Sequence, residues 1–514
     1  MDAWRKAVEC MKDKSIGDNK ILNVIALVIA AIMNISAIIL GIKVATMGVL
    51  PGQYLVGFAI IILLVDLVVW FTLKKKAMTV VMMLITASVA AITIYGFVAV
   101  LKVDSTIQKV TSGSNEYIRL SMVVRGDSPI DGLTSLYGAN VGYIDGDIHA
   151  LGILEQAKQE VMLGEIIGYP EAVKLAEALM NGSVDVILLN NEYIEIVDEF
   201  EDFEEFSLSV KIVYSVEIEI DPNANPVQVG VGLAEPTEDT DVTTIGDSST
   251  VDIESKEYTD DSIVIYISGI DTWGSVSVRS RSDVNILAVI NTKTGKMLMV
   301  NTPRDSYVSL VTKDGSMDKL THAGLYGIEC SETALENLYG VNIDYYVRLN
   351  FSGFEEIVDA LGGIDVYSEQ NFRVDDTFFV VGMNHLEGED ALRFARERYS
   401  FAGMGDVQRG RNQMEVIKAI IGKMTSFSMI SNYTEVLDAV GDSVMTDMPT
   451  EEIYNLVKFQ LATNTVWSFE TYTVIGSGGS EETYSIPGVQ SYVMLLDEEM
   501  IEEARNKMEE VLNE

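Results

Sequence analysis

Three long hydrophobic runs at the start of the chain constrain its architecture more than any other feature. They cover residues 21–42, 54–73 and 77–101, and each is long enough to cross the core of a bilayer, which takes about 20 helical residues. A cleavable signal peptide has one short apolar region followed by small residues, so three successive runs predict transmembrane helices instead. We therefore expect a cytoplasmic leader over residues 1–20 and a membrane region over residues 21–103.

Positive charges around the runs predict their orientation, because loops rich in lysine and arginine stay on the cytoplasmic side. The leader carries Arg5 and four lysines, and the turn between the second and third runs is Lys74-Lys75-Lys76. All residues after 101 are then expected outside the cell membrane, in a multi-pass protein with extracellular C-terminal domains. Asp66 in the second run is interpreted as a tolerated or helix-paired carboxylate, with a functional intramembrane acid as the alternative.

Charge divides the chain at the same place. Residues 1–103 hold ten Lys or Arg and five Asp or Glu, a net charge of +5 against −41 for the whole chain, which leaves −46 for the other 411 residues. An exterior this acidic excludes nucleic-acid binding. Cys10 and Cys330 fall on opposite sides of the expected membrane, and an extracellular region without a disulfide fits a bacterial surface.

Residues 104–220 are expected to form a small accessory α/β domain. Its apolar, β-branched strand candidates are residues 118–124, 139–144, 184–189 and 210–218, and its helix candidates are residues 150–161 and 170–181. This alternation favours a parallel sheet with crossover helices. The strings SPIDGLTSLYGANVGYI and EALMNGSVDVILLNN resemble one lobe of an extracellular solute-binding protein, but no arginine occurs between Arg125 and Arg279 to clamp an amino-acid carboxylate. A spacer or docking domain and a ligand sensor both stay open.

An acidic linker and a second α/β domain follow. Residues 221–261 are rich in Pro, Thr, Ser and acid and have no helical period, which is typical of a solvated linker. The second domain is expected over residues 262–430, with residues 431–514 as a C-terminal extension packed on it. SIVIYISGID predicts a buried strand, and VNILAVINTKTGKMLMVNT predicts two strands joined by the TKTG turn.

The rest of the second domain and its extension are expected to mix helices with short strands. The predicted helices are residues 332–339, 353–361 and 406–424, and the predicted strands are residues 345–349 and 364–367. In the extension we expect a helix, a strand and a helix, with a glycine-rich turn at residues 476–479.

Arginines concentrate in this second domain. Ten of the chain's 14 arginines lie between Arg279 and Arg411, and five of them lie in the string ALRFARERYSFAGMGDVQRGRNQ. Because a guanidinium group binds phosphate oxygens bidentately, such a cluster on an acidic chain predicts a dedicated anionic ligand. Arg396 and Arg398 can point the same way only where the chain is extended, so we expect the preceding helix to end close to Arg396.

The helix that follows is expected to complete a cradle of pyrophosphate size. Arg409 and Gln413 share one face of this helix with Asp406, which is expected to be its N-cap. The free N–H groups of a helix start, together with two or three guanidinium groups, are suited to a pyrophosphate. Arg411 lies off that face and is expected on the surface.

Two carboxylates at neighbouring strand ends are candidate metal ligands. Asp271 ends the strand SIVIYISGID, and Asp283 precedes the next strand, two residues after Arg281. One or two carboxylates together with substrate phosphates are a usual environment for Mg²⁺. Arg304 and Asp305 in TPRD follow the strand 297–302, and ligands of α/β sheets bind outside the carboxyl ends of strands.

Over about residues 260–425 the chain resembles the LytR-CpsA-Psr family. The resemblance is carried by GID, SRSDVNILAVINTKTGKMLMVNTPRDSYV, LNFSGFEEIVDALGGIDV, GMNHLEGEDALRFARER and GDVQRGRNQMEVIKAII. It implies a bacterial envelope protein that transfers a glycopolymer, such as teichoic acid or capsule, from a polyprenyl pyrophosphate to peptidoglycan. It also implies a set of site residues: Mg²⁺ on Asp271 and Asp283, and the pyrophosphate on Arg281, Arg304, Arg396, Arg398 and Arg409, with Gln413 beside them. Asn412 stands where many members have a further arginine, which leaves the clamp one charge short unless Arg411 compensates.

The resulting prediction is a membrane-anchored, Mg²⁺-dependent glycopolymer phosphotransferase. Two alternatives stay open: a polyprenyl pyrophosphatase, in which water replaces the peptidoglycan hydroxyl, and a non-catalytic sensor of the cell wall. Asp283 or Asp271 would be the base for the attacking hydroxyl. A polyprenyl chain needs an apolar groove, but the hydrophobic residues of this domain are interpreted mainly as ordinary core, because periodicity does not distinguish groove from core.

Overall fold

The computed structural model describes two compact units. The described residues are 2–73, 75–111, 116–200, 203, 205–220, 261–270, 275–401, 403, 405–425 and 429–514, with the backbone alone for 2–19, 429–433 and 442. One unit comprises Met1–Thr111, Tyr433–Gly441 and Met448–Val466, and the other comprises Ser112–Asn432, Asp442–Asp447 and Trp467–Glu514. The predicted linker lies outside the described residues, apart from Asp261.

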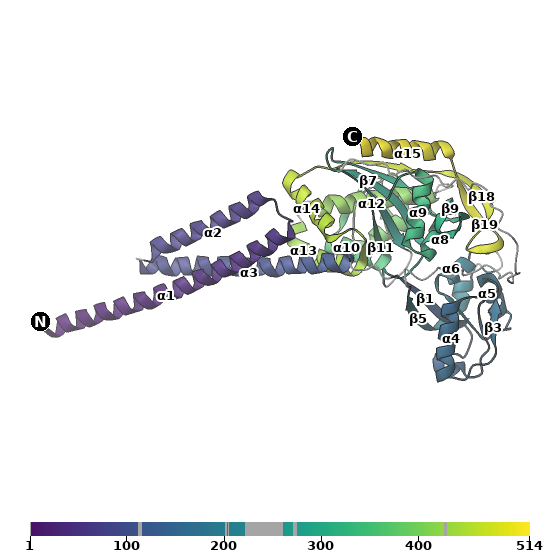
Figure 1. Cartoon of the computed structure of the whole chain (residues 1–514), viewed down its shortest axis with the longest axis horizontal. Helices are drawn as coiled ribbons and strands as arrows, with labels where there is room; N and C mark the ends of the chain where they lie inside the picture. Colours follow the sequence, from purple (N-terminus) through teal and green to yellow (C-terminus); the bar gives the residue numbers. More distant parts are fainter. Residues whose placement is uncertain are drawn as a thin grey trace, which may run out of the picture. The chain divides into compact units, whose positions relative to one another are not determined.

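The first unit is built on three long helices, α1 (Asp2–Met47), α2 (Gly52–Thr72) and α3 (Lys76–Thr111) (Figure 1). Three apolar segments, Lys20–Met47, Gly52–Thr72 and Lys76–Thr111, are long and apolar enough to cross a membrane, as predicted. Asp66 Oδ1 accepts a hydrogen bond of 3.0 Å from Asn34 Nδ2 on α1, so this carboxylate is paired with a neighbouring helix.

The same unit includes helices from near the C-terminus. They are α14 (Thr450–Thr463) and the central part of α13 (Met429–Ser443). Both attach to the last turns of α3: Tyr454 Oη donates to Asp104 Oδ1 at 2.6 Å, and Lys102 Nζ lies 2.7 Å from Asp438 Oδ2.

The second unit contains an accessory lobe, residues 116–220, and a main domain, which comprises the described residues of 261–432, 442–447 and 467–514. The lobe has a five-stranded sheet of order β3-β2-β4-β1-β5, in which β2 is parallel to β3 and β4 while β1 is antiparallel to β4 and β5. The expected all-parallel sheet is therefore wrong, because an apolar strand pattern does not reveal strand direction.

The lobe's elements are β1 (Tyr117–Arg125), η1 (Leu133–Leu136), β2 (Val141–Ile144), α4 (Ile148–Glu160), β3 (Ile166–Tyr169), α5 (Ala172–Met180), β4 (Val186–Asn190), α6 (Glu192–Val197), α7 (Phe206–Ser209) and β5 (Val210–Glu219). α6 follows β4 directly and lies at the end of the lobe that contacts the main domain (Figure 1).

The main domain is organised around a six-stranded sheet of order β16-β11-β6-β7-β8-β17. Its strands are β6 (Ser262–Ile270), β7 (Ser282–Asn291), β8 (Lys296–Asn301), β11 (Tyr345–Asn350), β16 (Val444–Thr446) and β17 (Ser468–Thr473). β6, β7 and β8 are antiparallel neighbours, whereas β11 runs parallel to β6 and β17 parallel to β8. The central strands are buried along most of their length, as is usual when both faces of a sheet are covered.

Helices cover this sheet. On one face α9 (Ile328–Tyr339) and α15 (Glu498–Asn513) pack Leu335, Met508 and Leu512 against Leu287 and Val300. α10 (Phe351–Ala360) contacts β11, α12 (Gly405–Met424) contacts β7 and β8, and α11 (Gly388–Arg396) packs between α10 and α12.

The smaller elements complete the main domain. They are β9 (Tyr307–Leu310), η3 (Val311–Lys313), β10 (Ser316–Lys319), α8 (Leu320–Ala323), η4 (Gly324–Tyr326), β12 (Ile364–Ser368), β13 (Phe372–Val374), β14 (Thr377–Phe379), β15 (Gly382–Leu386), β18 (Gly476–Thr483) and β19 (Ile486–Leu496).

Two expectations for residues 431–514 are corrected. These residues are not an extension packed on a finished domain, because β16 and β17 form both edges of the main sheet and α15 supplies core residues. Residues 476–479 are not a turn, because they belong to β18 and pair with β19.

Candidate functional site

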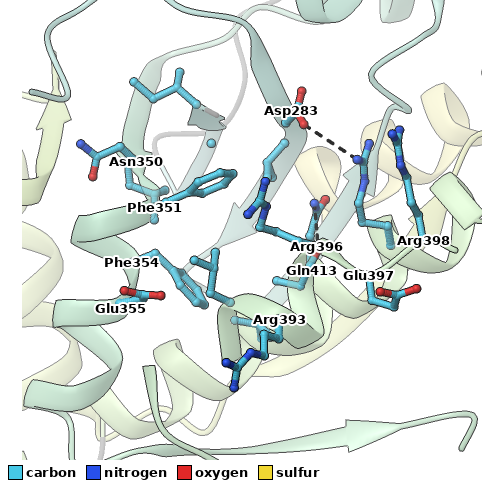
Figure 2. A pocket seen from close by; sticks show the side chains of 18 of the residues that line it. Asp283, Asn350, Phe351, Phe354, Glu355, Arg393, Arg396, Glu397, Arg398 and Gln413 are labelled. Atoms are coloured by element: carbon cyan, nitrogen blue, oxygen red, sulfur yellow. Dashed lines mark hydrogen bonds and ion pairs between the residues drawn. The ribbon is translucent and has the colours of Figure 1, made fainter. Parts of the chain in front are cut away.

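A cavity of about 550 Å³ lies in the main domain beside the ends of β6 and β7 and between α10, α11 and α12 (Figure 2). Its polar lining includes most of the predicted site residues, namely Asp283, Arg304, Arg396, Arg398, Arg409 and Gln413. These residues come from segments up to 130 positions apart along the chain, between Asp283 and Gln413. The fold therefore brings together at one cavity four of the five arginines that were predicted for the site.

Arg396 and Arg398 enter the cavity because a helix ends between them. α11 stops at Arg396, and Glu397 is extended with φ −63° and ψ 130°, as predicted. The Arg396 guanidinium lies over the Phe351 ring at 4.2 Å from its centroid, and the Arg398 guanidinium lies 4.9 Å from the centroid of Tyr399. Aromatic faces orient both guanidinium groups.

Asp283 is the carboxylate at the polar end of the cavity. Arg304 Nη1 donates to both of its oxygens, at 3.0 and 3.1 Å, and Arg409 Nη1 lies 3.8 Å from Oδ2. Its side chain is 11% exposed. Burial alone would raise the pKa of Asp283, but the charges of Arg304 and Arg409 outweigh burial and hold this pKa well below its ordinary value. Asp283 is therefore an anion at physiological pH.

The start of α12 places Arg409 beside Asp283. Arg409 Nη2 also lies 3.0 Å from Asp406 Oδ1, and burial lowers the pKa of Arg409 while Asp283 opposes that effect. Asp406 is the second residue of α12, which already begins at Gly405, so the predicted N-cap is wrong. Gln413 Nε2 donates to the Ala395 carbonyl at 3.3 Å and so ties α12 to α11.

Close approach of α12 to β8 depends on a glycine. A Cβ atom added to Gly410 would stand 2.1 Å from Asn301 Nδ2, at a site where the Asn301 side chain is buried. Any larger residue would push the helix away from the strand. Gly410 follows Arg409 directly, so this contact also sets the position of the arginine.

Two of the predicted site residues are not placed in the cavity. Asp271 lies outside the described residues, so the predicted pairing of Asp271 with Asp283 stays a prediction. Arg281 is described, but it is not among the described residues that line the cavity. Its guanidinium is 6% exposed and pairs with Glu195 of the accessory lobe.

Arg411 and Asn412 point away from this cavity. Arg411 is exposed and pairs with Glu369 at 3.6 Å, as expected for a surface residue. Asn412 is buried, donates through Nδ2 to the Phe394 carbonyl at 3.2 Å and accepts from Gln408 Nε2 at 3.1 Å. Neither residue supplies a further charge to the cavity.

The cavity also has an apolar lining, which sequence reasoning missed. It consists of Ile267, Ile270, Val284, Leu349, Phe351, Phe354, Val374, Leu392, Ala395, Val416 and Ile417, and the cavity is further lined by the charged residues Glu355, Asp375, Glu389, Arg393 and Glu397. Phe351 and Phe354 stand at the start of α10, where β11 ends; their position at a strand end in LNFSGF is the signal that could have found them. Thr321 was also missed: its Oγ1 donates to Asp283 Oδ1 at 3.2 Å.

Among the described residues, no group of three or more His, Cys, Asp or Glu is arranged to hold a metal ion. Asp283 nevertheless suits a Mg²⁺ ion that takes few protein ligands, because it is ionised and lines the cavity. Mg²⁺ commonly keeps waters and substrate phosphates in its coordination shell beside one or two carboxylates.

Comparison with known proteins identifies the family of this chain. The model of the LytR_cpsA_psr family matches residues 232–510, more than half of the chain. The polyisoprenyl-teichoic acid--peptidoglycan teichoic acid transferase TagU of Bacillus cereus is 36% identical over 197 residues, which cover 38% of this chain and 64% of TagU. A TagU of Enterococcus faecalis is 36% identical over 191 residues, 37% of this chain and 62% of the relative. The chain thus spans slightly less than two thirds of these two relatives.

Two solved structures are also similar over about half of the chain. The crystal structure of TagU from B. subtilis is 28% identical and covers 49% of this chain and 98% of TagU, with a TM-score of 0.39. The structure of TagT bound to LI-WTA is 26% identical and covers 51% of this chain and 95% of TagT, with a TM-score of 0.40. Because the family model spans more than half of its residues, the chain belongs to the LytR_cpsA_psr family.

Proposed function

We propose that this protein is a membrane-anchored phosphotransferase that moves a glycopolymer from a polyprenyl pyrophosphate to peptidoglycan. The observation that carries the proposal is one cavity of about 550 Å³ that is lined both by the arginines around Asp283 and by apolar side chains such as Phe351, Phe354 and Val416. A polyprenyl pyrophosphate has the same two parts, a charged head and a hydrocarbon tail. The TagU relatives named as teichoic acid transferases support a polymer of teichoic acid or capsule type.

The arginines supply what phosphoryl transfer needs most, which is positioning and charge stabilisation. Arg396 and Arg398, stacked on aromatic rings, would bind the pyrophosphate oxygens. Arg304 and Arg409 hold Asp283 in place. Gln413 anchors the helix that carries Arg409 and presents an amide at the same wall.

Asp283, with Asp271, would hold a Mg²⁺ ion. The ion would neutralise negative charge on the phosphates when it is bound. The acceptor hydroxyl of peptidoglycan has to lose a proton as it attacks the phosphorus atom, and Asp283 or Asp271 would accept that proton as the base. The polyprenyl phosphate leaves as the new sugar–phosphate bond forms.

The expected location accounts for substrate delivery. The three apolar helices anchor the chain, and the positive leader and the Lys74–Lys76 turn would keep the accessory lobe and main domain outside the cell. A lipid-linked substrate then arrives in the plane of the membrane, so it does not have to cross the field of an exterior with a net charge of −46.

The test uses the full chain in detergent with a short-chain polyprenyl pyrophosphate disaccharide and Mg²⁺, with and without peptidoglycan fragments. We expect glycan on the acceptor with the wild type and none with Arg396→Ala. Phosphate release that ignores the acceptor would instead identify a pyrophosphatase. Tight binding of the lipid without turnover would identify a sensor, and either result would overturn the proposal.

A further inference from the structure

A second pocket of about 340 Å³ lies in the main domain beside α12, β12 and β17. The lining of this outer pocket includes Tyr367, Glu369, Arg411, Glu415 and Tyr472. α12 borders both pockets, because Arg409 and Gln413 line the cavity of the candidate site while Gln408 and Arg411 line the outer pocket. None of the described residues lines both, and a pocket of this size can enclose a small ligand. The outer pocket is therefore a separate candidate site.

A buried amide network fixes one carboxylate of the outer pocket, that of Glu369. Gln408 Nε2 donates to Glu369 Oε2 at 3.3 Å and to Asn412 Oδ1 at 3.1 Å, and Gln370 Nε2 donates to Gln408 Oε1 at 3.2 Å. Gln408 and Asn412 are buried, and a satisfied buried network holds its members in one arrangement. Asn412 stands where many members of the family have an arginine, so the resemblance does not imply this network.

Arg411 brings hydrogen-bond donors to the same pocket. Its Nη1 lies 3.6 Å from Glu369 Oε2, and its side chain is 44% exposed. A contact of this length is longer than a hydrogen bond, and a guanidinium group has five N–H donors. The pair with Glu369 therefore leaves donors of Arg411 for a ligand.

Two tyrosines add aromatic surface beside these polar groups. Tyr367 is 48% exposed, so part of its ring is open to a ligand. Tyr472 is half-buried, and its Oη donates to Glu503 Oε2 at 2.9 Å, which fixes the position of the side chain. A tyrosine presents an apolar ring next to a polar tip, and such rings suit a ligand that has both apolar and polar surfaces.

The charges of the outer pocket favour a neutral ligand that is rich in hydroxyl groups. Arg411 faces Glu369, and Lys418 Nζ lies 2.6 Å from Glu415 Oε1, so each charge already has a partner of opposite sign. A hydroxyl group both donates and accepts hydrogen bonds and can therefore contact a guanidinium group and a carboxylate at once. A sugar ring carries several hydroxyl groups and also has an apolar C–H face that can lie on an aromatic ring.

We propose that the outer pocket binds a neutral saccharide, with a sugar ring on Tyr367 and its hydroxyl groups hydrogen-bonded to Arg411 and Glu369. This inference rests on the proposed function, which supplies two saccharides: the glycan strand of the peptidoglycan acceptor and the glycopolymer itself. The pocket would hold either one on the helix that also carries Arg409. A second contact of this kind raises the local concentration of the substrate and does not touch the reacting atoms.

The experiment measures saccharide binding to the full chain in a detergent without a sugar head group. One probe is the β-1,4-linked tetramer of N-acetylglucosamine, which represents the glycan strand, and the other is a glucose tetramer, which represents a glycopolymer. We expect the wild type to bind at least one of them. Arg411→Ala should weaken this binding about tenfold or more, because it removes a charged hydrogen-bond donor, and Tyr367→Ala should weaken it about 3–10-fold.

Matched controls change the same residue types outside both pockets. Arg373→Ala removes an exposed arginine that lies 3.3 Å from Asp376, and Tyr137→Ala removes an exposed tyrosine of the accessory lobe. Both variants should bind the saccharide like the wild type. Since Arg411 and Tyr367 are also well exposed, the midpoint of thermal unfolding should be unchanged in all four variants.

Transfer kinetics identify the source of the saccharide. Arg411→Ala should raise one KM about tenfold and leave kcat unchanged, because the lost contact is not specific to the transition state. A higher KM for peptidoglycan fragments would support the inference with the acceptor strand as the ligand. A higher KM for the lipid-linked polymer would support it with the glycopolymer as the ligand.

The inference is overturned if the wild type binds neither tetramer, or if Arg411→Ala and Tyr367→Ala bind like the wild type. Binding of the free stem peptide of peptidoglycan in place of both tetramers would also overturn it. Loss of geranylgeranyl diphosphate binding in Arg398→Ala would still leave the proposed function intact in these cases. Conversely, diphosphate binding that does not depend on Arg398, with saccharide binding that depends on Arg411, would refute the phosphate site and leave the outer pocket as a saccharide site.

Discussion

Replacing Glu332 with glutamine should stabilise the main domain, and increasingly so as the pH rises. Glu332 lies on α9 near Asp447 and Glu336, and burial together with those two carboxylates raises the pKa of Glu332 to about 8. A carboxyl group with a raised pKa binds a proton more tightly in the folded state. The stability that the protonated Glu332 gives to the folded state is therefore complete below the ordinary pKa, near 4.5. This stability is lost as the pH rises toward 8.

The size of the effect follows from linkage. Between pH 4.5 and about pH 8, each pH unit lowers the free energy of unfolding by about 1.4 kcal/mol relative to a protein with a residue that does not titrate at this position. Between about pH 5 and pH 7.5 the loss amounts to about 3 kcal/mol. Glutamine has the shape of the protonated acid and does not titrate, so Glu332→Gln should avoid this loss.

Thermal unfolding of the full chain in detergent measures the difference between variant and wild type at each pH. We expect no difference at about pH 4.5 and a midpoint roughly 5 °C higher for Glu332→Gln at about pH 7.5. Comparing the two proteins at one pH cancels the titration of all other groups. Glu329→Gln, at an exposed position of the same helix, removes one of the charges that raise the pKa of Glu332 and should give only a small part of the gain.

A pH-independent difference between Glu332→Gln and the wild type would refute the reasoning. So would a lower midpoint for the variant at neutral pH, because it would mean that the ionised carboxylate has a favourable partner. A similar pH-dependent gain in Glu329→Gln would show that the net charge of the helix is responsible, and not the burial of Glu332.

The remaining predictions concern the cavity. Arg398→Ala should weaken the binding of geranylgeranyl diphosphate about 10–100-fold, which is the effect of losing one charged hydrogen bond. The midpoint of thermal unfolding should not change, because Arg398 is paired only with the neighbouring Tyr399 in the contacts described. Asp283→Asn leaves two buried arginines without their carboxylate and should destabilise the main domain by about 3–5 kcal/mol. If the activity of this variant still responds to a Mg²⁺ titration, Asp283 is not a ligand of the metal ion. Gly410→Ala should cost about 1–3 kcal/mol through overpacking against Asn301 and reduce transfer; wild-type stability would disprove that contact.

The sequence predicted the central strands and the approach of Arg396 and Arg398 to one place well, because both depend on local patterns. The runs that became β6, β7 and β8 are continuously apolar, which is typical of strands covered on both faces. Arg396 and Arg398 needed only the end of one helix to be placed correctly. Neither prediction required knowledge of which distant segments meet.

Predictions that depend on distant contacts failed. β16 has three residues and β17 reads SFETYT, so neither has the apolar run of a core strand, and their place at the sheet edges is a tertiary effect. The pair between Arg281 and Glu195 joins residues 86 positions apart, and no local pattern links them. The apolar half of the cavity was read as core because groove and core residues have the same periodicity.

The arginines of the site fall into two classes according to what holds them. Arg304 and Arg409 are held by carboxylates, so their charges are largely compensated within the protein and serve to fix Asp283. Arg396 and Arg398 are stacked on Phe351 and Tyr399, and an aromatic face orients a guanidinium group. A diphosphate should therefore gain affinity from Arg398, whereas Arg304 and Arg409 keep the metal-binding carboxylate ionised and in place.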